Sequence, residues 1–311
     1  MLLFALLCIK IVDFFPIGFI IKWKYNKCNS TRFRKGSPMQ YIHNGRTLQI
    51  ADAHTHIYPN KIAEKAVHAV GDFYNIPMSS GGTAEDLIAS GDHIGVSYYL
   101  VCSVATRPEQ APSITTFIAD ECSKHPQFVG LGAYHQDVET PDVLLENVAA
   151  LGLRGIKLHS DFQRCNIDDP KMMPIYGMLC DLGLCVMFHM GDDRYDFSAP
   201  RRLVNVLEKY PDLKCLAAHF GGYQRWAEAK ECLAGAGKNV YFDTSSSLAF
   251  LDKEQAAEMI YKFGPEQMLF GTDFPMWTHK DELARFLNLS LPDSVNDQIL
   301  YENFKHFFDI G

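Results

Sequence analysis

Two histidines separated by one residue stand in the stretch ADAHTHIYP, at residues 51–59. Side chains two apart on a β-strand point to the same side, so His54 and His56 can face one point together. Neutral imidazole nitrogens are common ligands of Zn, Mn and Fe ions. One such pair is a weak signal, because many pairs are only hydrogen-bonded polar side chains. Its meaning depends on what else the chain brings to the same place.

Further polar side chains stand where other predicted strands end. His159, His189 and His219, and the carboxylate of Asp273, each close or follow a short apolar run. A buried imidazole needs a hydrogen-bond partner, which makes packing a poor explanation for five strand-terminal histidines. Imidazoles and a carboxylate are the ligand set of a hydrolytic metal ion that keeps one coordination position open for water. The sequence therefore predicts a metal site.

The elements that must position these residues alternate in type along the chain. Predicted strands cover residues 48–54, 97–105, 128–134, 154–160, 184–191, 213–221, 239–246 and 267–274. Predicted helices cover 60–72, 109–124, 141–151, 172–182, 199–210, 225–235, 252–263 and 279–288, with an extra helix near 83–94 and a closing helix within 292–308.

Eight βα units are the number that closes a (β/α)8 TIM barrel, an α/β fold whose chemistry lies at the carboxyl ends of the strands. An open doubly wound sheet is the alternative. That fold favours a glycine-rich turn after the first strand, where this chain has His-Thr-His-Ile-Tyr-Pro at residues 54–59. We therefore expect a single-domain barrel over residues 39–311.

The charge is unevenly distributed. Residues 1–38 carry a net charge of +6, and the remaining 273 residues carry -14. An acidic body argues against nucleic acid as a partner, because phosphate binding needs a basic face. Nine scattered cysteines without a C-x-x-C motif indicate reduced thiols in a cytoplasmic protein.

Residues 1–38 form an apolar and basic extension that we leave out of the fold prediction. The favoured interpretation is a misplaced start, with translation beginning at Met39. The alternative is a membrane anchor through residues 1–22, although Lys10 and Asp13 would be costly inside a bilayer. The basic cluster that follows would keep the body on the cytoplasmic side in that case. Both interpretations predict a cytoplasmic catalytic domain.

The motifs DAHTH, RGIKLHSDFQRCNIDDP, VMFHMGDD, LAAHFGGY, VYFDTSS and LFGTDFP resemble the amidohydrolase superfamily. More narrowly, residues 48–308 resemble its amidohydrolase-related branch, which includes aminocarboxymuconate semialdehyde decarboxylase-like proteins. The resemblance implies a metal-dependent barrel enzyme that acts on a small molecule, and it suggests a homodimer. It implies one divalent ion, with Zn first and Mn or Fe as alternatives, bound by four residues: His54, His56, His189 and Asp273.

The resemblance also implies roles for neighbouring residues. Asp273 would move a proton, and His219 would polarise the substrate or water rather than hold the metal. Members with two metals carry a carboxylated lysine on the fourth strand, where this chain has Lys157. We expect no second metal here, and Lys157 could pair with an acid below the site instead. His159 could line the site or bind substrate.

The loops after the strands should bind the substrate. Arg194 is the best candidate for a substrate carboxylate, because guanidinium pairs bidentately with that group. Tyr223 and Trp277 are further candidates. Asp52 is expected either to orient His54 from the same strand face or to pair with Lys157.

Three functions are compatible with this site. The first is hydrolysis of a small amide, lactone or ester by water activated on the metal. The alternative is non-oxidative decarboxylation of a small unsaturated or aromatic acid. The third, a metal-binding barrel without catalysis, is disfavoured because such a protein needs no proton-carrying Asp273.

Overall fold

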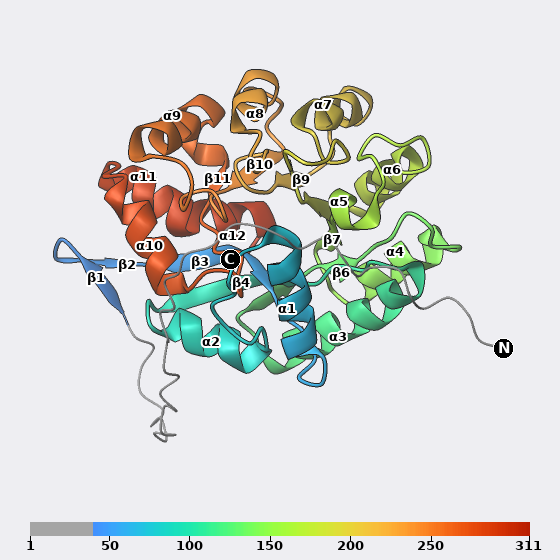
Figure 1. Ribbon diagram of the computed structural model, residues 1–311, viewed down its shortest axis with the longest axis horizontal. Helices are drawn as coiled ribbons and strands as arrows, with labels where there is room; N and C mark the ends of the chain where they lie inside the picture. The colour runs from blue at the N-terminus through green and yellow to red at the C-terminus, as the bar shows by residue number, and fades with distance from the viewer. Residues whose placement is uncertain (1–39) are drawn as a thin grey trace, which may run out of the picture. The chain divides into compact units, whose positions relative to one another are not determined.

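The computed structural model describes residues 40–311, in which the predicted strands form a parallel barrel (Figure 1). The prediction of a (β/α)8 barrel is confirmed. The wall consists of β3 (Ile50–His56), β4 (Val96–Cys102), β5 (Phe128–Gly130), β6 (Gly132–Ala133), β7 (Gly155–Leu158), β8 (Cys185–Phe188), β9 (Cys215–Ala217), β10 (Val240–Asp243) and β11 (Met268–Leu269).

Two junctions complete this wall. The third predicted strand is split at Leu131 into β5 and β6, and the Leu131 N–H still donates to Val101 O at 3.0 Å. On the other side, the region just after β11 meets β3 through a parallel bridge between Thr55 and Phe274. There the Asp273 N–H donates to His54 O at 2.8 Å. This backbone bond joins the two chain segments that carry the outermost candidate metal ligands.

Helices surround the strands (Figure 1). They are α1 (Ala63–Tyr74), α2 (Ala84–Asp92), α3 (Ala111–Lys124), α4 (Pro141–Ala150), α6 (Met173–Leu182), α7 (Pro200–Lys209), α8 (Trp226–Cys232), α9 (Lys253–Phe263) and α10 (His279–Asn288). Each agrees with its predicted range to within three residues at either end. A capping box formed by Asp252 and Gln255 begins α9.

Several short elements were not predicted. An antiparallel hairpin of β1 (Tyr41–His43) and β2 (Arg46–Leu48) precedes the barrel, and α5 (Ser160–Gln163) follows β7. The predicted closing helix consists of α11 (Asp293–Asp297), a π-helical turn (Gln298–Glu302) and α12 (Asn303–Phe308). Two 3-10 turns, η1 (Pro108–Gln110) and η2 (Pro265–Gln267), complete the described elements.

Apolar side chains alternate between two layers along each strand, as the period of two requires. The inner layer includes Ala53, Leu100, Met187 and Leu216, and α12 adds three phenylalanines to it. The outer layer packs the opposite strand faces, such as Val186, against the helices. The barrel is therefore filled largely by apolar side chains from within.

A β-bulge in β3 changes which residues face inward. Asp52 pairs with Tyr99 and Thr55 pairs with Val101, so three steps on β3 oppose two on β4. A bulge shifts the alternation of side chains by one residue. Asp52 consequently faces the outer layer, where its carboxylate lies 3.0 Å from the ring of His279 on α10. The prediction that Asp52 shares a face with His54, and contacts its ring or Lys157, was wrong for this reason.

The predictions for residues 1–38, a misplaced start or a membrane anchor, lie outside the described residues. Within residues 40–311, no helix has the length and hydrophobicity needed to cross a membrane.

Gly155 provides a test of the barrel wall. A Cβ atom there would lie 1.9 Å from the backbone oxygen of Cys185 on the neighbouring strand, and backbone cannot move aside as a side chain can. We expect Gly155→Ala to lower the free energy of unfolding by about 3 kcal/mol, as overpacking does. Urea denaturation would measure it. Gly177→Ala, within α6, is the control: an added Cβ would lie 3.2 Å from the Tyr210 ring, a side chain that can shift, so the effect should be small. Equal effects would contradict the wall geometry.

Candidate metal centre

Three predicted ligands converge at the mouth of the barrel. His54 Nε2 and His56 Nε2 lie 3.2 Å apart, and Asp273 Oδ1 lies 3.5 and 3.4 Å from them. His54 is almost fully buried, whereas His56 and Asp273 keep 13% side-chain exposure toward the mouth. The strand ends of β3 and β11 therefore bring together a donor set separated by more than 200 residues in the sequence.

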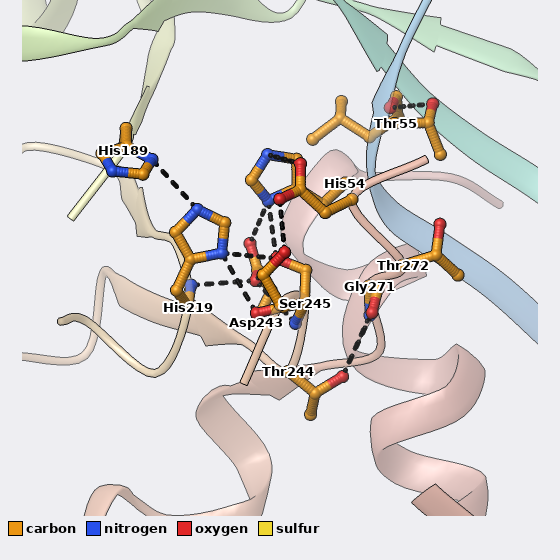
Figure 2. Close-up of polar contacts among 12 residues, drawn as sticks. His54, Thr55, His189, His219, Asp243, Thr244, Ser245, Gly271 and Thr272 are labelled. Carbon is orange, nitrogen blue, oxygen red and sulfur yellow. Dashed lines mark hydrogen bonds and ion pairs between the residues drawn. The ribbon is translucent and has the colours of Figure 1, made fainter. Parts of the chain in front are cut away.

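The other ring nitrogen of His54 is held by the end of β10. His54 Nδ1 lies 3.0 Å from Asp243 Oδ2 and 2.9 Å from Ser245 Oγ (Figure 2). Because the Asp243 carboxylate accepts hydrogen bonds, Nδ1 carries the proton and Nε2 presents its lone pair to the mouth. Asp243 was not predicted as a site residue. Its position as the last residue of an apolar strand run was the available signal.

His189 and His219, which follow β8 and β9, form a second pair. His189 Nε2 lies 2.9 Å from Gly191 O, and His219 Nδ1 lies 3.0 Å from Ser245 O. A carbonyl oxygen can only accept, so both of these nitrogens carry protons. The remaining nitrogens, His189 Nδ1 and His219 Nε2, are unprotonated and lie 3.1 Å apart (Figure 2).

These five side chains, His54, His56, His189, His219 and Asp273, are called the candidate metal centre below. Burial lowers the pKa of the His54, His189 and His219 rings, which are therefore neutral near pH 7. Neutral lone pairs that face each other repel, and a cation between them turns the repulsion into coordination. The chemistry of this donor set fits a divalent ion.

His189 is placed beside His219 rather than in direct contact with the other three predicted ligands. The structure groups His54, His56 and Asp273 within ligand distance of one another, without His189. Its role as the fourth ligand stays a prediction.

Two other groups of histidines and carboxylates are better explained by internal hydrogen bonds. In the group of His54, His219 and Asp243, both imidazole Nδ1 atoms donate to protein acceptors. In the group of His159, Asp161 and His189, His159 Nδ1 accepts the Phe162 N–H at 3.3 Å. Its Nε2 therefore carries a proton and cannot bind a metal.

Lys157 enters the barrel interior from β7. It is 1% exposed, and its Nζ lies 3.2 Å from His54 Nε2. Burial lowers the pKa of this amine. The sequence-based alternatives for Lys157 were a bridging ligand or a partner for an acid below the site. The structure places it beside His54 Nε2, a predicted ligand atom, with Asp52 on the other face of the wall.

His159 lies against the inner wall of the mouth. Its ring stacks on Phe162 and on His189, and its Nε2 donates to Tyr74 Oη at 2.9 Å. Tyr74, at the end of α1, also lies 3.3 Å from His189 Nε2. No pattern in the sequence pointed to Tyr74, because its helix packs over the mouth only in the folded barrel.

The three predicted substrate-binding residues have different surroundings. Arg194 donates Nε and Nη2 to Asp192 and Nη1 to Phe73 O, which occupies its guanidinium fork. Tyr223 packs edge-on to Tyr74 and near His219. Trp277 donates its indole N–H to Ser246. Tyr223 thus lies beside the candidate metal centre, whereas Arg194 and Trp277 have protein partners; binding of substrate by all three stays a prediction.

A parallel barrel with convergent imidazoles at its carboxyl end is the architecture of a barrel enzyme. The amidohydrolase family matches residues 51–310, so this chain belongs to that family and is an enzyme of the amidohydrolase superfamily.

Its relatives include decarboxylases. The chain is 26% identical over 197 residues to a 2-amino-3-carboxymuconate-6-semialdehyde decarboxylase of Dictyostelium discoideum, a match that spans 58% of this chain and 54% of the relative. It shares its fold with a 5-carboxyvanillate decarboxylase from Sphingomonas paucimobilis, with TM-score 0.65 and 15% identity over 85% of this chain and 100% of that one. A dihydroxybenzoic acid decarboxylase from Polaromonas sp. JS666, with bound manganese and the inhibitor 2-nitroresorcinol, has TM-score 0.65 and 15% identity over 85% and 97%.

Asp243 gives a test of the orientation of His54. Its Oδ1 accepts from the backbone N–H groups of His219 and Ser245 while Oδ2 accepts from His54, so an asparagine amide must turn its NH2 toward a donor. We expect Asp243→Asn to weaken the binding of Mn²⁺ or Zn²⁺ about 10–100-fold, measured by titration calorimetry. Thr244→Val removes a neighbouring buried hydroxyl that contacts only Gly271; it should leave the affinity unchanged.

Proposed function

We propose that this chain is a metal-dependent decarboxylase that releases carbon dioxide from a small unsaturated or aromatic carboxylic acid. The convergence of unprotonated nitrogens and the Asp273 carboxylate at the barrel mouth carries the proposal. The decarboxylase activities of these related proteins support this chemistry better than the hydrolysis that the sequence favoured.

We infer that one divalent ion would be held by His54, His56, His189 and Asp273. The sequence favoured Zn²⁺, and the manganese bound to the dihydroxybenzoic acid decarboxylase supports Mn²⁺ as a second candidate. When bound, the ion would act as a Lewis acid toward substrate oxygens.

The reaction breaks the bond between the carboxyl carbon and the adjacent carbon, and the electron pair stays on the latter. One proton from solvent must reach that carbon as carbon dioxide leaves. Asp273 is suited to carry it, because its carboxylate faces the mouth and keeps contact with solvent. His219 Nε2 carries no proton and can accept one from a substrate hydroxyl. The Tyr74 and Tyr223 rings beside His189 and His219 would limit the access of water.

An assay of chemistry separates the two candidate reactions. Protein loaded with Mn²⁺ or Zn²⁺ would be offered small unsaturated and aromatic carboxylates, with carbon dioxide measured, and small lactones, esters and amides, with acid measured. We expect carbon dioxide release, and Asp273→Asn to reduce it about 100-fold or more through the lost proton transfer. Acid release alone would favour the hydrolase, and full activity of Asp273→Asn would refute its role.

Metal content tests the number of ions. We expect elemental analysis to find one divalent ion per chain, lost on chelation and strongly reduced in His189→Ala. Lys157→Met should keep that single ion. Two ions in the unaltered protein, falling to one or none in Lys157→Met, would contradict the proposal and favour a bridging lysine.

A further inference from the structure

The two oxygens of Asp273 have different surroundings. Oδ1 faces His54 and His56, whereas Oδ2 accepts a hydrogen bond from Ser246 Oγ at 2.6 Å. This distance is that of a charge-assisted O–H···O⁻ bond. Ser246 is 2% exposed and lies in the loop after β10, so no solvent competes at its hydroxyl.

The direction of this hydrogen bond is set by Trp277. Its indole Nε1 lies 3.0 Å from Ser246 Oγ, and an indole N–H can only donate. The Ser246 oxygen therefore accepts from Trp277, which leaves its own proton for another acceptor. Two are in reach, Asp273 Oδ2 and Met276 Sδ at 3.4 Å. A carboxylate is a far stronger acceptor than a thioether, so the proton points to Asp273.

The indole itself is held in place. The guanidinium of Arg285 lies 4.8 Å from the centre of the Trp277 ring, and Arg285 is paired with the buried carboxylate of Glu282 on the same helix, α10. A chain of contacts thus runs from α10 through Trp277 and Ser246 to one oxygen of Asp273. Trp277 was predicted to bind substrate, yet its indole N–H points to Ser246.

We propose that Ser246, oriented by Trp277, is a positioning residue that fixes which carboxylate oxygen of Asp273 faces the candidate metal centre. With Oδ2 occupied by the hydroxyl, Oδ1 is the free oxygen toward the imidazoles. Ser246 and Asp273 both have positive φ angles, +48° and +57°, rare for non-glycine residues. Such backbone conformations persist where surrounding contacts determine them, and they cluster at functional sites. The inference rests on the proposed function only for the chemistry that Asp273 performs.

A double-mutant cycle tests this role. Ser246→Ala, Trp277→Phe and the double variant would be titrated with Mn²⁺ in full-length chain, using the signal of free Mn²⁺ in electron paramagnetic resonance. We expect Ser246→Ala to weaken binding about 10–100-fold, as loss of a ligand's supporting hydrogen bond does. Trp277→Phe should weaken it less and should add nothing in the Ser246→Ala background, because the indole acts through the hydroxyl.

Thr115→Val is the control. Its buried hydroxyl on α3 accepts the Ala133 N–H at 3.2 Å and forms no hydrogen bond with the candidate metal centre, Asp273 included. It should lower the unfolding midpoint, as the loss of a buried hydrogen bond does, and leave Mn²⁺ binding unchanged. Wild-type affinity in Ser246→Ala, an equal loss in Thr115→Val, or additive effects in the cycle would overturn the proposal.

The proposed decarboxylase function can be refuted independently of the positioning role of Ser246. Protein that binds Mn²⁺ with the expected cycle but releases no carbon dioxide would sink the decarboxylase and keep the positioning role. Protein that releases carbon dioxide, but whose Mn²⁺ affinity is unchanged in Ser246→Ala, would keep the decarboxylase and overturn the positioning role. A chain that binds neither Mn²⁺ nor Zn²⁺ would overturn both.

Discussion

An imidazole at the mouth of this barrel can bind a metal ion only if it leaves one nitrogen without a proton. For His54, His189 and His219, the protein achieves this by giving the other nitrogen a strong acceptor: a carboxylate for the first and backbone carbonyls for the other two. Burial then keeps the rings neutral. Lone pairs that face one another in this way repel, and a cation bound between them would relieve this repulsion.

The barrel brings these side chains together while the strands themselves keep ordinary backbone conformations. Parallel strands all end at one rim, so β3, β8, β9 and the segment after β11 can each bring one or two of these side chains to it. The residues that follow the strands adopt less favourable backbone conformations. His219, Phe220, Ser246 and Asp273 all adopt left-handed backbone conformations, which non-glycine residues avoid. The polar run from Asp243 to Ser247 is buried throughout and contacts both histidine pairs and Asp273, so it stabilises these conformations.

Sequence periodicity predicted the eight strands and the nine helices that follow or precede them, because burial of one face leaves a local pattern. It could not predict contacts that depend on closure. The partner of the His54 ring is Asp243, 189 residues away. Asp52, two residues away, accepts only the backbone N–H of His54. The bulge that turns Asp52 outward exists only in the pairing of β3 with β4. For the same reason His279, a helical residue in a polar stretch, is fully buried against Asp52.

The substrate is the property that the sequence predicts least well, and the reason is related. A hydrolase and a decarboxylase can share one set of metal ligands and differ in how substrate is held and how far water is excluded. Those properties come from loop side chains, whose partners are unknown until the loops are placed. Arg194 is tied to Asp192 and Phe73, and Trp277 to Ser246. The groups that line the mouth beside the imidazoles are the rings of Tyr74 and Tyr223. Rings of this kind would pack against the face of a flat, unsaturated acid, which accords with the proposed decarboxylation.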